Sequence, residues 1–290
     1  MLTPNEARHV AERYREEGYA IIRGFLDPDE IDALQAETRR VYEEGLTHHA
    51  TFRHRNLCFE ILPEEDFGQR YVIQVQWQAW ISAYFEEFRR RQEYFAVLEP
   101  ILGRDIKQIA QQIHWKPPGA KATGYRFHQD LRFRDPSGYD DVAFNTVTTG
   151  LAIDRATREN GCLQVIPGSH KMGYLGLSDD GDGQLMKGLT AEEELKAVGI
   201  DPGDAVALEM EPGDLVLWSL LTVHGSMPNH SAHDRAFAIS SYVRADTTDR
   251  GEWAFRDGVP QTLGETPKLC KYDMLFERPG PLYETQQWWR

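Results

Sequence analysis

Residues 214–226 read DLVLWSLLTVHGS, and this stretch decides what kind of core the chain can build. The run from Leu215 to Val223 is almost wholly apolar and contains β-branched and aromatic residues, which predicts a buried strand. It ends at His224, just before Gly225. A histidine at the end of a buried strand, beside a turn, is rigidly presented. The stretch therefore predicts a β-type core that carries a chemically active side chain.

Short runs of the same type fill most of the chain between residues 106 and 243. They are Ile106–Trp115, Phe127–Phe133, Val142–Ile153, Leu163–Ile166, Ala205–Met210, Asp214–His224 and Arg235–Val243. Turn-forming sequences such as Pro-Pro-Gly, Asp-Pro-Ser-Gly and Glu-Pro-Gly-Asp separate them. Many short strands with this punctuation predict a sandwich or small barrel.

The chain before residue 105 follows a different pattern. Apolar positions at helical spacing predict helices over residues 5–17, about 29–45 and about 83–101. Gly18 would end the first helix, and Asp27 or Asp29 would cap the second. Between these helices, residues 19–22 predict a short strand. This part of the chain is therefore expected to support the β-core from outside.

Two further segments differ from the strand pattern. Residues 172–201 are rich in Gly, Asp and Glu and contain a short helical stretch, Ala191–Val198, as expected for an insertion near a barrel mouth or a surface excursion. Residues 246–290 show no clear period. We expect a mainly β fold with flanking helices in one domain over residues 1–290. Its parts are a helical support over about 1–105, a jelly-roll core over about 106–245 and a C-terminal extension over 246–290.

The composition excludes several classes of protein. A formal net charge of −14 over 290 residues argues against a nucleic-acid partner. No apolar run approaches the roughly 18 residues that span a bilayer. The polar N-terminus lacks the core of a secretory signal, so we expect a cytoplasmic protein. The three cysteines are widely separated, which disfavours a zinc site or a disulfide framework. The oligomeric state stays open.

A pair of metal-ligand residues, His128 and Asp130, lies in one of the predicted strands. Residues i and i+2 of a strand point to the same face, so both side chains can reach one metal, while Gln129 points to the other face. Two histidines and one carboxylate on one side of a metal are the ligand set of non-haem Fe(II) oxygenases. Such a set leaves positions open for a cosubstrate and O₂. Because His-x-Asp arises often by chance, the assignment needs a third ligand.

His224 is the histidine best placed to complete the set. Most other histidines lie in a helix, in polar loops or at turns, and His114, beside Trp115, is interpreted as a core or pocket residue. Arg235 opens the next predicted strand, which we expect to pair with the His224 strand as a hairpin. A planar guanidinium suits bidentate binding of a carboxylate. Pairing of Arg235 with an internal acid is the alternative.

At this point the chain resembles the phytanoyl-CoA dioxygenase family of Fe(II)/2-oxoglutarate-dependent oxygenases. The resemblance covers roughly residues 5–245 and lies in Gly18-Tyr19 to Gly24-Phe25-Leu26, Lys116-Pro117-Pro118-Gly119, Phe127-His128-Gln129-Asp130, Asn160-Gly161-Cys162 to Pro167-Gly168-Ser169-His170, and Gly213-Asp214 through His224-Gly225-Ser226 to Arg235. It implies a double-stranded β-helix core, which is a cupin-like jelly roll. It also implies Fe(II) at His128, Asp130 and His224, with 2-oxoglutarate and O₂ as cosubstrates.

The same resemblance implies roles for the residues around the metal. The distal carboxylate of 2-oxoglutarate would lie on Arg235, with Ser226, Lys116 and Gln129 as further cofactor-binding residues. Halogenating relatives lack the metal-binding carboxylate. Asp130 therefore favours hydroxylation of an unactivated C–H bond in a small molecule, with release of succinate and CO₂.

Two arginines after the metal pair suggest what the substrate carries. Arg132 would share the strand face of the metal pair, and Arg134 follows it. A small substrate with a carboxylate or phosphate group would suit them, so we expect a small-molecule and anionic substrate. Salt bridges to Asp140 or Asp141 are an equally good alternative.

The pocket near the iron is expected to differ from that of the family's founding member. Some members carry a tryptophan on the strand before the Asn-Gly-Cys turn, whereas residues 145–151 here are small and polar. This predicts a roomier or more polar pocket, with Thr149 as a substrate contact, and weakens any transfer of an acyl-CoA substrate. The histidine- and arginine-rich stretch at 48–55 is either a solvated loop or a lid with substrate-binding cations.

Two other classes of protein fit the same barrel. One is a cupin-like metal enzyme that does not use 2-oxoglutarate, and the other is a binding or sensing module without turnover. Arg235 and Ser226 discriminate, because a buried arginine without a cosubstrate carboxylate would be costly. The complete ligand set likewise argues against a module that has lost catalysis.

Overall fold

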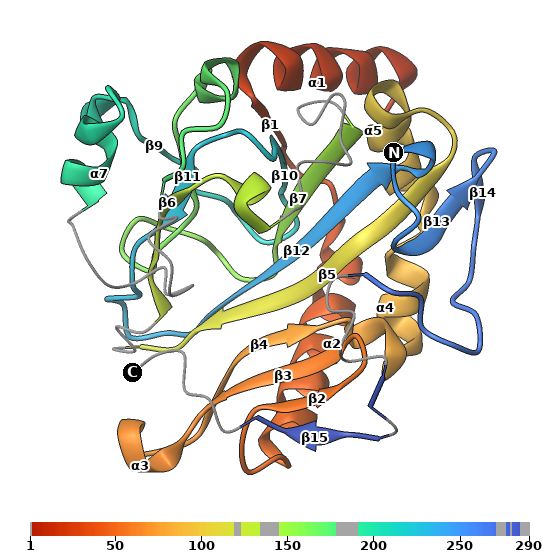
Figure 1. Cartoon of the computed structure of the whole chain (residues 1–290), viewed down its shortest axis with the longest axis vertical. Helices are drawn as coiled ribbons and strands as arrows, with labels where there is room; N and C mark the ends of the chain where they lie inside the picture. The colour runs from red at the N-terminus through yellow and green to blue at the C-terminus, as the bar shows by residue number, and fades with distance from the viewer. Residues whose placement is uncertain are drawn as a thin grey trace.

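Two antiparallel sheets form the core of the protein in the computed structural model (Figure 1). The structure describes residues 2–118, 123–133, 145–177, 191–270, 277–278 and 280–284, and the side chains of Arg132, Phe133 and Ala191 are outside the description. The larger sheet runs diagonally through the molecule, and the smaller one lies beside α7.

The larger sheet contains most of the described strands. In spatial order these are β1 (Tyr19–Ile22), β10 (Leu215–Ser219), β7 (Thr146–Ala152), β12 (Arg235–Arg244), β5 (Ile106–Lys116), β4 (Tyr71–Gln76), β3 (Leu57–Leu62), β2 (Phe52–His54) and β15 (Leu282–Tyr283). β13 (Glu252–Arg256) also pairs with β5 and with β14 (Val259–Pro260). The smaller sheet has the order β6 (Tyr125–His128), β11 (His224–Ser226), β8 (Gln164–Val165) and β9 (Val206–Ala207).

The helices begin and end within about one residue of the predicted bounds, except that one predicted helix is divided in two and α3 was not predicted. They are α1 (Pro4–Glu17), α2 (Pro28–Leu46), α3 (Glu64–Phe67), α4 (Ala83–Phe88), α5 (Gln92–Leu102) and α7 (Ala191–Ala197). Thr3 and Asp27 form capping boxes at the starts of α1 and α2, and Gly18 ends α1 with φ 79°. The single helix predicted over residues 83–101 is in fact α4 and α5. The Arg89 carbonyl accepts a hydrogen bond from the Tyr242 hydroxyl at 2.8 Å, which satisfies the end of α4 without further helix.

Short 3₁₀ turns join several of these elements. They are Gln78–Trp80, Asp130–Phe133, Ser169–Met172, Pro202–Asp204 and Ala245–Thr247.

Two strand predictions need correction where the chain changes sheets. The run Asp214–His224 is two strands, because a turn at Ser219–Thr222 carries the chain from the larger sheet to the smaller one. The Thr222 hydroxyl anchors this turn by donating to the Gly18 carbonyl at 2.6 Å. His224 therefore begins a strand instead of ending one. The run Phe127–Phe133 likewise leaves the strand after His128 and continues as a 3₁₀ turn.

The sequence suggested a helical support over about 1–105, but this part of the chain also contains strands. β2, β3 and β4 extend the larger sheet beyond β5, and β15 adds to the edge of β2. Stretch 48–55 ends in β2, where Phe52 is half-buried and Arg53 is buried. Residues 52–54 are therefore part of the sheet and not a solvated loop.

The main core lies between the larger sheet and the helices of the N-terminal part. Leu34 and Val41 of α2, Leu98 of α5, and Phe59 and Ile113 of the sheet are fully buried together there. A smaller apolar cluster places α7 against the smaller sheet through Leu195. No helix of the described residues is long and apolar enough to cross a bilayer.

Candidate metal and cosubstrate site

The pairing of β6 with β11 brings His128 and His224 directly opposite each other. Their ring centroids are 4.3 Å apart. Asp130 opens the 3₁₀ turn after β6, and its Oδ1 lies 3.6 Å from His128 Nε2 and 3.5 Å from His224 Nε2. The structure thus brings the three predicted ligands together, although Asp130 reaches the site from a turn and not from the strand.

Backbone carbonyls fix which nitrogen of each histidine faces the site. His128 Nδ1 is 2.8 Å from the Arg126 carbonyl, and His224 Nδ1 is 2.8 Å from the Thr222 carbonyl. Each Nδ1 must therefore carry the proton and donate it, which leaves Nε2 as the lone-pair donor. Both Nε2 atoms point towards Asp130.

The two oxygens of Asp130 have different tasks. Oδ2 accepts hydrogen bonds from Trp218 Nε1 at 3.0 Å and from the Thr148 hydroxyl at 3.2 Å, while Oδ1 faces the histidines. Burial raises the pKa of Asp130, but the two imidazoles outweigh it and hold the pKa well below its usual range. The carboxylate is ionised and held in one orientation, as a metal ligand needs to be.

This donor set fits Fe(II). Two imidazole nitrogens and one ionised carboxylate oxygen converge, with all three ligand atoms within 4.8 Å of one another. The opposite side is open to a cavity of about 400 Å³ that the three residues help to line. A facial triad with open positions is the geometry of non-haem iron oxygenases.

Two buried cations lie beside the triad. Arg235 on β12 and Lys116 on β5 are register partners, and both are almost fully buried in the wall of the cavity. Arg235 Nη2 donates to the Gly161 carbonyl at 2.6 Å, whereas its Nε has no hydrogen-bond partner among the described residues. Burial lowers the pKa of Arg235 to about 10.

The partners of Lys116 are all uncharged. Its Nζ donates to the Ser226 hydroxyl at 2.7 Å and to the Met227 carbonyl at 2.6 Å. Burial, together with the nearby Arg235 charge, lowers the pKa of Lys116 well below its ordinary value. Two buried basic side chains with neutral partners, one of them with an orphaned guanidinium N–H, form an anion site, which a dicarboxylate such as 2-oxoglutarate fits.

The Asn-Gly-Cys turn has a steric reason to contain glycine at its centre. Gly161 has φ +75°, and a Cβ there would lie 2.0 Å from the Met227 carbonyl oxygen and 3.1 Å from Lys116 Nζ. Any side chain would therefore displace both the turn and the lysine. The turn delivers the carbonyl that holds Arg235.

Several predicted contacts lie elsewhere. Gln129 was grouped with the cofactor residues, but its amide donates to the Gly173 and Leu221 carbonyls at 2.8 and 2.7 Å, and its Oε1 accepts from Leu175 N–H. It ties the 3₁₀ turn to the neighbouring loop and faces away from the cavity. Thr149 also points away and donates to the Ser240 carbonyl, whereas its neighbour Thr148 lines the cavity. Because successive residues of a strand point to opposite faces, only one of these two neighbours on β7 can face the cavity.

The predicted substrate contacts Arg132 and Arg134 cannot be placed. The Arg132 side chain and all of Arg134 lie outside the described residues, as do Asp140 and Asp141. The expected hairpin between the strands of His224 and Arg235 is absent as well. β12 instead lies between β5 and β7 in the larger sheet, and Arg235 faces the cavity from there.

Sequence reasoning identified only His114, as a core or pocket residue, in a second part of the cavity wall. Residues from β2 to β5 and one residue after β15 line it, namely Arg53, Glu60, Gln74, Gln76, Gln112, His114 and Glu284. We call these seven residues the far wall. Alternation of polar and apolar residues in Tyr71–Gln76 is the signal that could have shown a strand with one polar face.

Comparison with known proteins identifies the class and then the family. Among proteins of assigned function, the chain is 24% identical over 233 residues to a probable α-ketoglutarate-dependent hypophosphite dioxygenase of Stutzerimonas stutzeri, covering 80% of this chain and 77% of that protein. It is 22% identical over 245 residues to a 2-aminoethylphosphonate dioxygenase of an uncultured bacterium, covering 84% of each. These relatives and the triad define a 2-oxoglutarate-dependent non-haem iron dioxygenase.

The family follows from a match over most of the chain. Residues 14–237 match the phytanoyl-CoA dioxygenase family, and the chain belongs to that family. The fold agrees with the crystal structure of EctD from S. alaskensis with 2-oxoglutarate and 5-hydroxyectoine, at a TM-score of 0.63 and 20% identity, covering 93% of this chain and 88% of that one. The predicted jelly-roll fold and the predicted cosubstrate class are thereby confirmed.

Proposed function

We propose that this dioxygenase hydroxylates a C–H bond of a small polar molecule at the metal side of the described cavity. His128, Asp130 and His224 would hold Fe(II), and Arg235 would hold the distal carboxylate of 2-oxoglutarate. The observation that carries the proposal is the position of two buried cations beside a complete facial triad, all lining one cavity. A cupin-like metal enzyme without an anionic cosubstrate would have no use for these cations.

When bound, iron and 2-oxoglutarate supply the activation of O₂, with one oxygen atom going to the substrate and the other to succinate as CO₂ leaves. The residues of the chain supply orientation and charge. Arg235 offers its orphaned Nε–H towards a carboxylate, while Lys116 holds Ser226 at the same end of the cavity. Thr148 and Trp218 keep Oδ1 of Asp130 on the metal side. Because Asp130 occupies the position that halogenating relatives leave open, hydroxylation is the proposed outcome.

The substrate itself is proposed only as a class. The relatives that act on hypophosphite and 2-aminoethylphosphonate support a small substrate with an anionic group. Arg132 and Arg134 are our proposed contacts for that group, on sequence grounds alone. We also propose that the chain acts as one catalytic domain. The expected cytoplasmic location stays a prediction.

The experiment is a substrate screen with succinate as the readout. The Fe(II)-loaded protein is incubated with 2-oxoglutarate, O₂ and a panel of small polar compounds that includes aminophosphonates. We expect at least one compound to stimulate succinate formation with one equivalent of hydroxylated product. His128→Ala and Asp130→Ala should abolish the stimulation, and full turnover in either variant would contradict the proposal.

A further inference from the structure

The far wall forms a continuous polar row across neighbouring strands. Gln74 on β4 is the register partner of both Glu60 on β3 and His114 on β5. Gln76 and Gln112 are paired two residues further along. Because side chains two residues apart share a face of a strand, all five side chains point into the same cavity.

Hydrogen bonds give this row a direction. The hydroxyl of Tyr125, also in the cavity wall, is 2.9 Å from His114 Nδ1, and burial lowers the pKa of His114 to about 3, so the ring is neutral. His114 Nε2 then carries the proton and lies 2.9 Å from Gln112 Oε1. With the Gln74 amide oriented so that its oxygen faces His114 Nε2 at 2.8 Å, its nitrogen lies 2.7 Å from Glu60 Oε1. Gln76 Nε2 donates to the same carboxylate at 3.2 Å. The chain of donors ends on the carboxyl group of Glu60.

The single cation of the far wall is already committed. Arg53 Nε donates to the Glu284 carboxylate at 2.5 Å. The charges of Glu284 and Glu60 both contribute to raising the pKa of Arg53 although burial opposes this. With Lys116, Asp130 and Arg235 assigned to the metal and cosubstrate, the remaining charged residues of the described lining are one guanidinium and two carboxylates.

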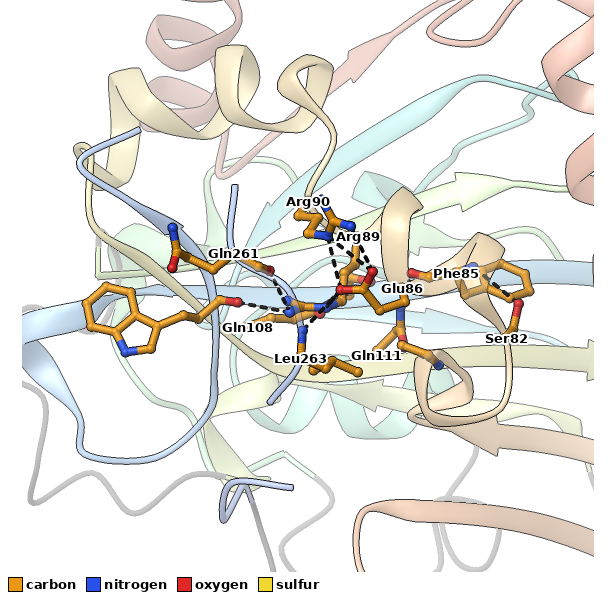
Figure 2. Close-up of polar contacts among 12 residues, drawn as sticks. Ser82, Phe85, Glu86, Arg89, Arg90, Gln108, Gln111, Gln261 and Leu263 are labelled. Atoms are coloured by element: carbon orange, nitrogen blue, oxygen red, sulfur yellow. Dashed lines mark hydrogen bonds and ion pairs between the residues drawn. The ribbon is translucent and has the colours of Figure 1, made fainter. Parts of the chain in front are cut away.

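The wall is rigidly supported from behind. Gln111, which directly precedes Gln112 on β5, accepts a hydrogen bond from Ala79 N–H at 3.0 Å and donates to the Phe85 carbonyl at 3.2 Å. Figure 2 shows Gln111 reaching towards Phe85 within α4, with Ser82 capping the same helix. The Gln111 carbonyl also accepts from Trp77 N–H at 2.7 Å, which holds the Trp77 residue that lines the cavity. A preformed polar surface of this kind recognises a ligand group at little cost in ordering.

We propose that the far wall is a substrate-recognition subsite that takes a protonated amine. The inference rests on the proposed function, because it assigns one polar group of the substrate that enters the same cavity. A carboxylate or phosphonate at this wall would face two carboxylates and an arginine that is already paired. An ammonium group would instead donate to Glu60 and to the amide oxygens beside it.

The test compares two probes that differ only in one terminal group. Isothermal titration of anaerobic Fe(II)·2-oxoglutarate protein with 5-amino-1-pentanol and with 5-hydroxypentanoate measures the preference for a cation over an anion. We expect the amine to bind at least about tenfold more tightly, as for a hydrogen bond to a charged group. Glu60→Gln should reduce this preference to less than about threefold. The matched control Glu65→Gln, on the exposed side of α3, should keep it.

The outcomes separate this inference from the proposed function. Tighter binding of 5-hydroxypentanoate, no binding of the amine at millimolar concentration, or a full preference in Glu60→Gln protein would overturn the inference. The same titration is repeated on metal-free protein. A failure to bind Fe(II) and 2-oxoglutarate, with the amine preference intact in the metal-free protein, would overturn the proposed function alone. If circular dichroism shows that Glu60→Gln does not fold, Glu284→Gln is used instead. It removes the second carboxylate and releases Arg53 from its ion pair, so it should also reduce the preference for the amine, and a full preference would overturn the inference.

Discussion

The two walls of one cavity differ in how their charges are used. On the iron side, Arg235 and Lys116 are buried with neutral partners, and the oxygen Oδ1 of Asp130 faces open space between two imidazoles. On the far wall, Arg53 is paired with Glu284, and Glu60 is held by amides. The first wall offers two basic side chains to an anionic cosubstrate, whereas the second has two carboxylates and one arginine that is already paired. We therefore assign the reaction class to the wall that carries the metal ligands and Arg235, and we propose that the far wall selects the substrate.

The largest expected effect comes from removing the metal carboxylate. Asp130→Ala should abolish substrate-dependent succinate formation and retained Fe(II), because two imidazoles alone do not complete the triad. Metal analysis after desalting and a succinate assay measure the two effects. Asp204→Ala, at a 3₁₀ turn remote from the cavity, is the control. Retention of iron and turnover by Asp130→Ala protein would contradict the assignment of Asp130 as a metal ligand on the iron side of the cavity.

The next effect concerns the cosubstrate cation. Arg235→Gln should weaken 2-oxoglutarate binding by roughly 30-fold or more, which corresponds to about 2 kcal/mol for one partner of a buried charge pair. Arg244→Gln, at the exposed end of the same strand, should leave the affinity unchanged. Equilibrium titration of the Fe(II) protein with 2-oxoglutarate gives both values. Equal affinities in the two variants would show that Arg235 is only a structural residue.

A third prediction concerns a buried arginine that holds the C-terminal extension in place. Arg89 at the end of α4 is buried and donates to the Trp253 and Gln261 carbonyls at 2.9 and 3.1 Å, so it holds the C-terminal extension against the helix (Figure 2). Arg89→Ala should lower the free energy of unfolding by about 3 kcal/mol, because it leaves buried carbonyls unsatisfied.

The neighbouring arginine provides the matched comparison. Arg90 is partly exposed and pairs with Glu86 four residues earlier, so Arg90→Ala should cost less than about 1 kcal/mol. Urea unfolding of both variants decides the matter. Similar losses in the two proteins would mean that the buried guanidinium does not brace the extension.

The smallest effect is a pH dependence of stability. The folded protein keeps His114 neutral down to about pH 3, whereas the unfolded chain takes up this proton near pH 6.5. The free energy of unfolding should therefore fall as pH drops below about 6.5, by about 1 kcal/mol per pH unit from this residue. His114→Gln should remove that part of the slope in metal-free protein. Parallel slopes for wild type and variant between pH 6.5 and 5 would show that His114 is protonated in the wall.

The sequence predicts the iron wall well because ligand chemistry restricts the residue types. His128, Asp130, His224 and Arg235 were all identified from residue type and position, and the structure places them around one cavity. The predicted secondary structure around two of these residues was wrong. Asp130 lies in a 3₁₀ turn and not in a strand, and the strand of Arg235 pairs with β5 and β7 and not with the strand of His224. A turn can reproduce the i, i+2 proximity of a strand, so the spacing alone does not distinguish them.

The far wall could not be predicted in the same way. Glu60, Gln74 and Gln112 are common surface residues, and their sequence neighbours carry no motif. They become a wall only because β3, β4 and β5 pair in register, and because β15 adds Glu284 from the far end of the chain. Non-local pairing of this kind has no local signal in a single sequence. The short strands β2–β4 were also hidden among stronger helical patterns.

The central claim is that one cavity wall holds Fe(II) and 2-oxoglutarate together. Anaerobic titration of the protein with Fe(II) and then 2-oxoglutarate tests it directly through the weak visible charge-transfer band of the chelate. We predict a band that saturates at one Fe(II) per chain and is lost in His224→Ala protein. Absence of the band in the wild type, or its survival unchanged in His224→Ala, would contradict the account.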